Sequence, residues 1–150
     1  MNQKKNKVKF LVIRFSSIGD IVLTSPVVRC LKNQVSGARV HFLTRPEFST
    51  LVSSNPYIDK VHAHCNKLNE LITLLRQEHY DHIIDLQNNL RSNFIKAVLG
   101  VPSSTFKKLN IKKFIMVNYK INLLPSVHIV DRYMDTLSGF NVKNDKKGLD

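Results

Sequence analysis

A chain of 150 residues is long enough for one domain with a hydrophobic core and too short for two domains of ordinary size. Hydrophobic residues make up 43% of it and charged residues 23%, which excludes an intrinsically disordered chain. No apolar run approaches the roughly 18 residues of a membrane-spanning helix, and the first strong run has the length of a strand. Two cysteines, Cys30 and Cys65, are too few for a disulfide framework, so we expect a cytoplasmic protein.

The formal net charge of +12 is the one unusual bulk property. Clustered lysines attract polyanions, which include nucleic acid, an anionic lipid surface and a phosphorylated glycolipid, although such clusters also serve simply as a solvated surface. Charge alone does not distinguish among these. The clusters comprise Lys4, Lys5, Lys7 and Lys9, then Lys107, Lys108, Lys112 and Lys113, and finally Lys143, Lys146 and Lys147.

The first predicted element is a strand at residues 8–13, which is apolar on both faces as a central parallel strand should be. A loop follows, and then a helix at about residues 27–35. Ser25 before Pro26 fits an N-cap followed by proline at the first helical position. The alternative is one helix that begins near Ile18 and is kinked at Pro26.

The rest of the chain alternates short apolar strands with helices, which indicates βαβ units. We expect strands at 39–43, 60–63, 82–86 and, weakly, 103–106, with helices at 46–52, 67–77, 90–99 and 127–137. The clearest amphipathic helix is 67–77, whose predicted apolar side holds Leu68, Leu71, Ile72, Leu74 and Leu75. The sequence therefore predicts an α/β fold, with a Rossmann-like, mainly parallel sheet covered by helices on both faces.

Open parallel sheets bind ligands beyond the carboxyl ends of their strands, in the loops that lead into the helices. The polar residues expected there are rich in hydrogen-bond donors and cations, which suits a hydroxylated, anionic ligand such as a sugar acid or a phosphate. They are Ser16, Ser17 and Asp20, then Thr44 and Arg45, then His62 and His64, and finally Gln87, Asn88, Asn89 and Arg91.

The first of these loops carries the sequence Ser-Ser-Ile-Gly-Asp-Ile-Val-Leu-Thr-Ser-Pro at residues 16–26. Its single glycine makes it neither a dinucleotide fingerprint nor a P-loop. The loop resembles the N-terminal signature of the lipopolysaccharide heptosyltransferases, glycosyltransferase family nine. The stretch 80–92 is similar to that family's second N-terminal block and residues 128–133 to a third, while 148–150 resemble the run into the interdomain region.

The resemblance implies the N-terminal half of a two-domain GT-B glycosyltransferase. Residues 1–142 would be the acceptor-side domain and 143–150 the start of an interdomain linker, with the donor domain absent from this sequence. The family implies inverting, metal-independent transfer from a nucleotide sugar such as ADP-heptose to a lipopolysaccharide core or related glycan, with no cofactor. This chain alone would be inactive, and the whole would lie in the cytoplasm at the anionic inner membrane surface.

On this resemblance, Asp20 would be the catalytic base. The expected substrate-binding residues are Ser16, Ser17, Gly19, Arg45, Gln87, Asn88 and Arg91.

Several alternatives remain open from the residues themselves. Asp20 also fits a capping box with Ser17, in which its carboxylate merely satisfies a helix N-terminus. The run His62-Ala63-His64-Cys65 could suggest a metal, but no second ligand cluster has zinc spacing, so we expect no metal site. The competing function classes are a basic nucleic-acid-binding module and a generic flavodoxin-like ligand-binding domain. Against the former, the lysine clusters lack interleaved aromatic residues for base stacking.

Overall fold

The computed structural model describes residues 7–63, 67–106 and 125–149. The helices and strands are β1 (Val8–Ile13), α1 (Ile18–Val22), α2 (Ser25–Gln34), β2 (Ala38–Thr44), η1 (Pro46–Phe48), α3 (Ser49–Ser53), β3 (Lys60–Ala63), α4 (Leu68–Glu78), β4 (His82–Asp85), α5 (Leu90–Leu99), β5 (Ser103–Thr105), α7 (Pro125–Asp135) and η2 (Ser138–Phe140). Lys107 to Lys113, His64 and Cys65 lie outside the described residues.

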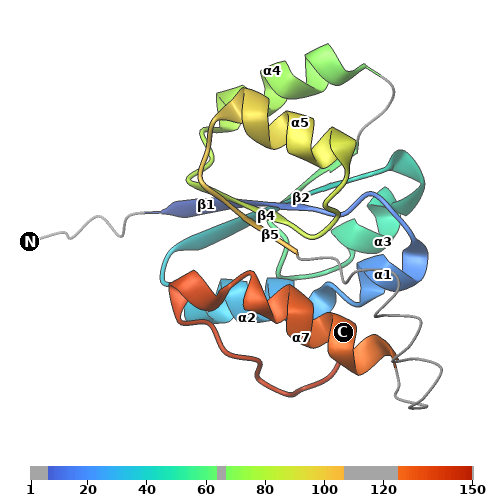
Figure 1. Ribbon diagram of the computed structural model, residues 1–150, viewed down its shortest axis with the longest axis vertical. Helices are drawn as coiled ribbons and strands as arrows, with labels where there is room; N and C mark the ends of the chain where they lie inside the picture. The colour runs from blue at the N-terminus through green and yellow to red at the C-terminus, as the bar shows by residue number, and fades with distance from the viewer. Residues whose placement is uncertain (1–6, 64–66, 107–124, 150) are drawn as a thin grey trace, which may run out of the picture.

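Within the described part of the chain, five parallel strands form one sheet in the order β3-β2-β1-β4-β5. Helices α4 and α5 cover one face, and α2 and α7 cover the other (Figure 1). The prediction of a parallel sheet with helices on both faces is therefore confirmed. So is the prediction that the strands at 8–13 and 82–86 are interior, because β1 pairs with β2 and β4, and β4 pairs with β1 and β5.

Alternate residues of β1 build the two halves of the core. Phe10 and Val12 pack with the α2 and α7 layer, whereas Leu11 and Ile13 pack with the α4 and α5 layer. All four side chains are fully buried. A strand covered on both faces must be apolar throughout, which explains why its sequence does not alternate.

The segment between β1 and α2 differs from both predicted forms. The chain makes two helices, α1 and α2, and the N-cap of α2 is Thr24. The prediction of Ser25 as N-cap is therefore wrong by one residue, with Pro26 at the second helical position. Proline is tolerated in a first helical turn because that turn's N–H groups have no partner within the helix.

Helix α4 follows the predicted amphipathic pattern with one exception. Leu71, Ile72 and Leu75 are buried against the sheet, and Leu68 packs at the edge of the same core. Leu74 is 53% exposed, so the prediction that it faces the core is wrong. At about 100° per residue, positions 68, 71, 72 and 75 fall within an arc of about 100° around the helix, and position 74 lies about 60° outside that arc.

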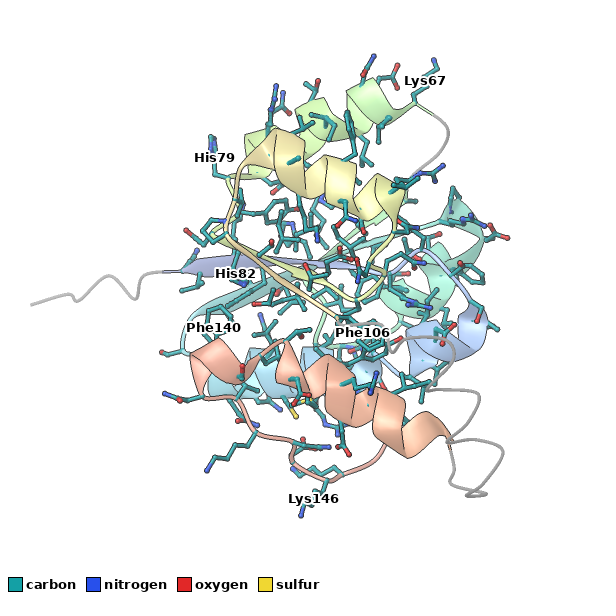
Figure 2. All side chains as sticks on the ribbon, viewed as in Figure 1. Lys67, His79, His82, Phe106, Phe140 and Lys146 are labelled. Atoms are coloured by element: carbon teal, nitrogen blue, oxygen red, sulfur yellow. The ribbon has the colours of Figure 1, made fainter. Side chains whose placement is uncertain are left out.

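The last described segment lies back along α2. The Arg29 guanidinium donates from Nε to Asp145 Oδ2 at 2.8 Å and from Nη2 to Asp145 Oδ1 at 2.7 Å. Gln34 exchanges two hydrogen bonds with the backbone of Lys143. Hydrogen bonds thus hold residues 143–149 against α2. Their role as the start of a linker stays a prediction. Lys146 points outward from this segment (Figure 2).

Candidate functional site at the β1–β4 edge

The order of the strands places a topological switch point between β1 and β4, because the chain moves outward to β2 on one side and to β5 on the other. The loops that follow these two strands are joined by hydrogen bonds. Phe15 N donates to Gln87 Oε1 at 3.0 Å, and Arg14 Nη1 donates to the carbonyl of Leu86 at 2.7 Å. Two of the predicted ligand-binding segments therefore lie side by side at this edge of the sheet.

Asp20 lies in the first turn of α1, and three groups of the protein engage one of its two oxygens. Ser17 donates to Oδ2 from its hydroxyl at 2.8 Å and from its backbone N–H at 3.2 Å. Arg14 Nη2 lies 2.9 Å from the same oxygen. Partial burial raises the pKa of Asp20, but these hydrogen bonds and the charge of Arg14 outweigh it and leave the pKa lowered. The carboxylate is therefore ionised at neutral pH.

The other carboxylate oxygen, Oδ1, receives no hydrogen bond from the part of the chain that the structure describes. The Asp20 side chain is 32% exposed. Ser17 and Asp20 do make the N-terminal contact that the capping interpretation predicts. This contact uses Oδ2 alone, so capping and an interaction of Oδ1 with a ligand are compatible.

The remaining predicted residues of the β1 loop are accessible at the same edge. Ser16 is half-buried, and Ser17 is exposed. Gly19 is exposed, and a Cβ added there would meet nothing within 4 Å. No described neighbour therefore requires glycine at this position, and the role of Gly19 in substrate binding stays a prediction.

The residues of the β4 loop divide into structural and accessible groups. Asn88 adopts a left-handed backbone, with φ of 50°, and its Nδ2 donates to the carbonyl of Phe106 at 2.9 Å. Gln87 commits its Oε1 to Phe15, which leaves the Nε2 donors. Arg91 is exposed, and its guanidinium lies 5.7 Å from the centroid of the Phe15 ring. Arg91 and the amide of Gln87 are thus the groups of this loop most open to a ligand.

Tyr133, the last residue of the third sequence block (128–133), packs against the residue to which the β4 loop is hydrogen-bonded. Tyr133 of α7 is almost fully buried, and its ring lies 4.9 Å from that of Phe106 in an edge-on arrangement. Figure 2 shows Phe106 between the sheet and α7. The Phe106 carbonyl accepts a hydrogen bond from Asn88, so the contact of Tyr133 with Phe106 helps to hold the β4 loop in place. Burial raises the pKa of Tyr133 to about 12, so the phenol stays neutral.

The segments after β2 and β3 place fewer polar side chains at this edge of the sheet than the sequence predicted. Arg45 is exposed directly after β2, where we placed it. Thr44 is fully buried and cannot reach a ligand at the surface. His62 lies inside β3 and is 8% exposed, so its predicted place in a loop is wrong. The strand begins at Lys60 and ends at Ala63, one residue beyond this histidine.

Asp85 at the end of β4 holds the following loop in shape. It is fully buried, and its Oδ1 accepts from the backbone N–H groups of Gln87 and Asn88 at 3.0 and 2.9 Å. Lys96 Nζ of α5 lies 2.8 Å from Oδ2. Lys96 was not predicted. The signal that could have found it is a lysine on the helix that directly follows a strand ending in a buried acid.

A second polar cluster, which we call the His41 cluster, was not predicted. It comprises His41, His62, Glu78 and Tyr80. One ligating atom from each of His41, His62 and Glu78 lies within 4.8 Å of the others. The Tyr80 hydroxyl lies 2.9 Å from His41 Nδ1 and 2.9 Å from His62 Nε2. Finding this cluster from sequence requires the register of β2 with β3, which sets Leu43 beside His62 and His41 beside Lys60.

The contacts of the His41 cluster disfavour a bound cation. Lys9 and Lys60 both bind the Glu78 carboxylate, lowering the pKa of Glu78 to about 2 and already neutralising its charge. The Tyr80 hydroxyl occupies the position between the two rings. It has one proton, so it donates to one imidazole and accepts from the other. The cluster is therefore a hydrogen-bonded polar part of the core, on the face covered by α4.

No family model matches the chain. The chain is 25% identical over 139 residues to lipopolysaccharide heptosyltransferase 1 of Campylobacter coli, which covers 87% of this chain and 41% of that protein. The resemblance to the N-terminal portion of the heptosyltransferases is thereby confirmed, and the chain spans less than half the length of this curated relative.

Solved structures of the same group share the fold. A family nine glycosyltransferase from Veillonella parvula superposes with a TM-score of 0.72 at 18% identity, over 95% of this chain and 44% of that one. An E. coli heptosyltransferase solved with ADP gives 0.66 at 15% identity, over 95% and 51%. The E. coli ADP-heptose lipopolysaccharide heptosyltransferase II gives 0.58 at 24% identity, over 63% and 29%. At these identities the likeness shows the fold alone.

Proposed function

We propose that this chain is the acceptor-side half of a heptosyltransferase-like glycosyltransferase and that Asp20 is its general base. The observation that carries the proposal is the Asp20 carboxylate. It is ionised and anchored through Oδ2, and its Oδ1 is left open at the switch point of a parallel sheet. The similarity to a curated heptosyltransferase supplies the class of reaction.

The chemistry requires a base within hydrogen-bond reach of the acceptor hydroxyl. Asp20 would accept the proton of that hydroxyl while its oxygen attacks the anomeric carbon of the donor. The bond from the sugar to the nucleotide diphosphate then breaks, and the configuration at the anomeric carbon inverts. Ser16 and Ser17 can hydrogen-bond the acceptor, but their hydroxyls are too weakly basic to replace the carboxylate.

Metal-independent transfer is part of the proposal, and the polar groups of the loops after β1, β2 and β4 support it. These groups are the hydroxyls of Ser16 and Ser17, the amide of Gln87 and the guanidinium groups of Arg45 and Arg91. These donate hydrogen bonds and attract anions, whereas a hard cation prefers several carboxylate or carbonyl oxygens. The same groups suit a hydroxylated, anionic acceptor such as the lipopolysaccharide inner core.

The nucleotide sugar would be held by the part of a complete enzyme that corresponds to the rest of the curated relative, of which this chain covers 41%. The E. coli relatives are described as an ADP-heptose heptosyltransferase and as a heptosyltransferase with ADP, so we propose an ADP-heptose-like donor. On this proposal the chain alone transfers no sugar.

We also propose that the protein works at the anionic inner face of the membrane, where a glycolipid acceptor would be presented. The net charge of +12 supports this. None of the described helices is long and apolar enough to span a bilayer.

Asp20→Asn in the product of the complete reading frame that encodes this chain tests the role of Asp20. Asparagine keeps the size and a hydrogen-bond acceptor for Ser17 but loses the basicity. Turnover should fall about 100-fold or more while the protein stays folded. Glu47→Gln is the matched control, because Glu47 is an exposed acid after β2 and should be dispensable. If Asn at position 20 supports near-normal turnover, Asp20 is only a cap.

A further inference from the structure

Arg14 directly follows β1 and is nearly buried, with 11% of its side chain exposed. Sequence analysis assigned it no role. Its Nη1 donates to the Leu86 carbonyl at the end of β4, and its Nη2 lies 2.9 Å from Asp20 Oδ2. Its Nε is buried and has no hydrogen-bond partner in the part of the chain that the structure describes.

A guanidinium removed from water is costly unless its charge and its N–H groups are satisfied. Among the residues that the structure describes, Asp20 is the only carboxylate paired with Arg14, and Leu86 supplies a backbone acceptor. The two Nη atoms of Arg14, which form the fork of the guanidinium, therefore connect the end of β4 with α1 across the switch point. The hydrogen bond between Phe15 and Gln87 joins the same two loops.

We propose that Arg14 is a positioning residue for Asp20: its guanidinium fixes Oδ2 and thereby directs Oδ1 toward the acceptor hydroxyl. This rests on the proposed function, in which Asp20 is the base. Ser17 alone could hold Oδ2, but its hydroxyl and N–H come from the same short helix end as Asp20. Arg14 ties the carboxylate to the sheet, which is the rigid part of the molecule.

The same contact also favours the ionised form of the base. Partial burial alone would raise the pKa of Asp20. The hydrogen bonds from Ser17, followed by the charge and the hydrogen bond of Arg14, lower this pKa instead.

The direct test is the titration of the Asp20 carboxyl, followed by carbon-13 NMR in the 150-residue chain. Arg14→Gln removes the charge and keeps hydrogen-bonding capacity, so the midpoint of Asp20 should rise by about one pH unit or more. Arg14→Lys keeps the charge without the fork, so the midpoint should lie between those of the wild type and Arg14→Gln.

Arg29→Gln is the matched control, since Arg29 is another nearly buried arginine paired with a carboxylate, that of Asp145. It should leave the Asp20 midpoint unchanged. An unchanged midpoint in a folded Arg14→Gln chain would overturn the proposal. If Arg14→Gln does not fold, the Arg14→Lys chain decides in its place, because a midpoint equal to that of the wild type would show that the fork is not needed.

A kinetic arm uses the product of the complete reading frame. Arg14→Gln should lower kcat/KM and move the acidic limb of its pH profile to higher pH, with Arg14→Lys restoring part of the loss. A limb that stays in place contradicts a positioning role. The proposal for Asp20 and the proposal for Arg14 can fail separately. An active Asp20→Asn enzyme would refute Asp20 as the base. The NMR titration measures the contact between Arg14 and Asp20 whether or not Asp20 is the base.

Discussion

Asp20 and Asp85 both lie beside a basic side chain, yet they differ in how many of their oxygens the protein engages. Asp85 is fully buried, with one oxygen on two backbone N–H groups and the other beside Lys96. Asp20 is one-third exposed and has one oxygen engaged. The first arrangement holds a loop in shape, and the second leaves the lone pairs of Oδ1 open, as the proposed role of a base requires.

The His41 cluster predicts how stability depends on pH. Burial, together with nearby His41 and Lys60, lowers the pKa of His62 to about 4, whereas the unfolded chain protonates this histidine near pH 6.5. The unfolded state therefore binds the proton first on acidification. The stability from a neutral His62 is complete above about pH 6.5 and is lost as the pH falls toward 4, by roughly 3 kcal/mol at most.

Thermal or urea unfolding between pH 4 and 8 measures this slope. His62→Gln retains hydrogen-bonding groups for Tyr80 but does not titrate, so its stability should fall less steeply between pH 6.5 and 4. His79→Asn is the control, because it removes an exposed histidine and keeps a residue that tolerates the left-handed backbone at this position. Equal slopes for the wild type and His62→Gln would show that this histidine does not drive acid unfolding.

At the residue scale, the sequence predicted the local part of the site and missed the part that depends on packing. Asp20, Ser17 and Gln87 could be placed because each directly follows a recognisable strand. Arg14 could not, since its role depends on which strand lies beside β1. Thr44 was misplaced because β2 runs one residue beyond the predicted strand. His62 was misplaced although β3 has the predicted bounds, because it lies inside that strand and not in the loop after it.

At the scale of elements, helix α4 shows that two adjacent leucines can lie on different sides of the boundary between core and surface. Leu75 is 1% exposed, while its neighbour Leu74 is 53% exposed. Leu75→Ala should therefore lower the free energy of unfolding by about 2 to 4 kcal/mol, because it removes buried methyl groups and leaves a cavity. Leu74→Ala should change it by less than about 0.5 kcal/mol.

Urea denaturation of both variants checks this pair. Similar losses in the two would mean that α4 is rotated relative to the sheet. The strands were easier to predict than the helix boundaries, because short, mainly apolar segments such as 8–13 and 82–86 match few other structures. The break between α1 and α2 could not be predicted, since a proline in a first helical turn and a proline at a kink leave the same sequence pattern.

At the scale of the whole molecule, the excess of positive charge predicts a salt-dependent association with anionic membranes. Each lysine near such a surface contributes about 1 kcal/mol, and the interaction fades over a Debye length of about 10 Å at 0.1 M salt. Vesicles containing anionic phospholipid should bind the chain at low salt and release it steeply as salt is added.

Reversing Lys143, Lys146 and Lys147 to glutamate should weaken this binding, since all three are exposed. Neutral vesicles and a duplex DNA of matched concentration are the comparisons. A chain that ignores anionic vesicles at low salt but binds the DNA would favour the nucleic-acid-binding alternative over membrane attachment.

The proposed function requires the loops after β1 and β4 to bind the acceptor. A titration of the nitrogen-15-labelled chain with a lipid-free inner-core oligosaccharide, followed by amide chemical shifts, tests this requirement. We expect shifts concentrated at Ser16 to Asp20 and at Gln87 to Arg91, with little change around His41 and Tyr80. Saturable shifts confined to another surface, or none at millimolar glycan, would refute acceptor binding at this edge of the sheet.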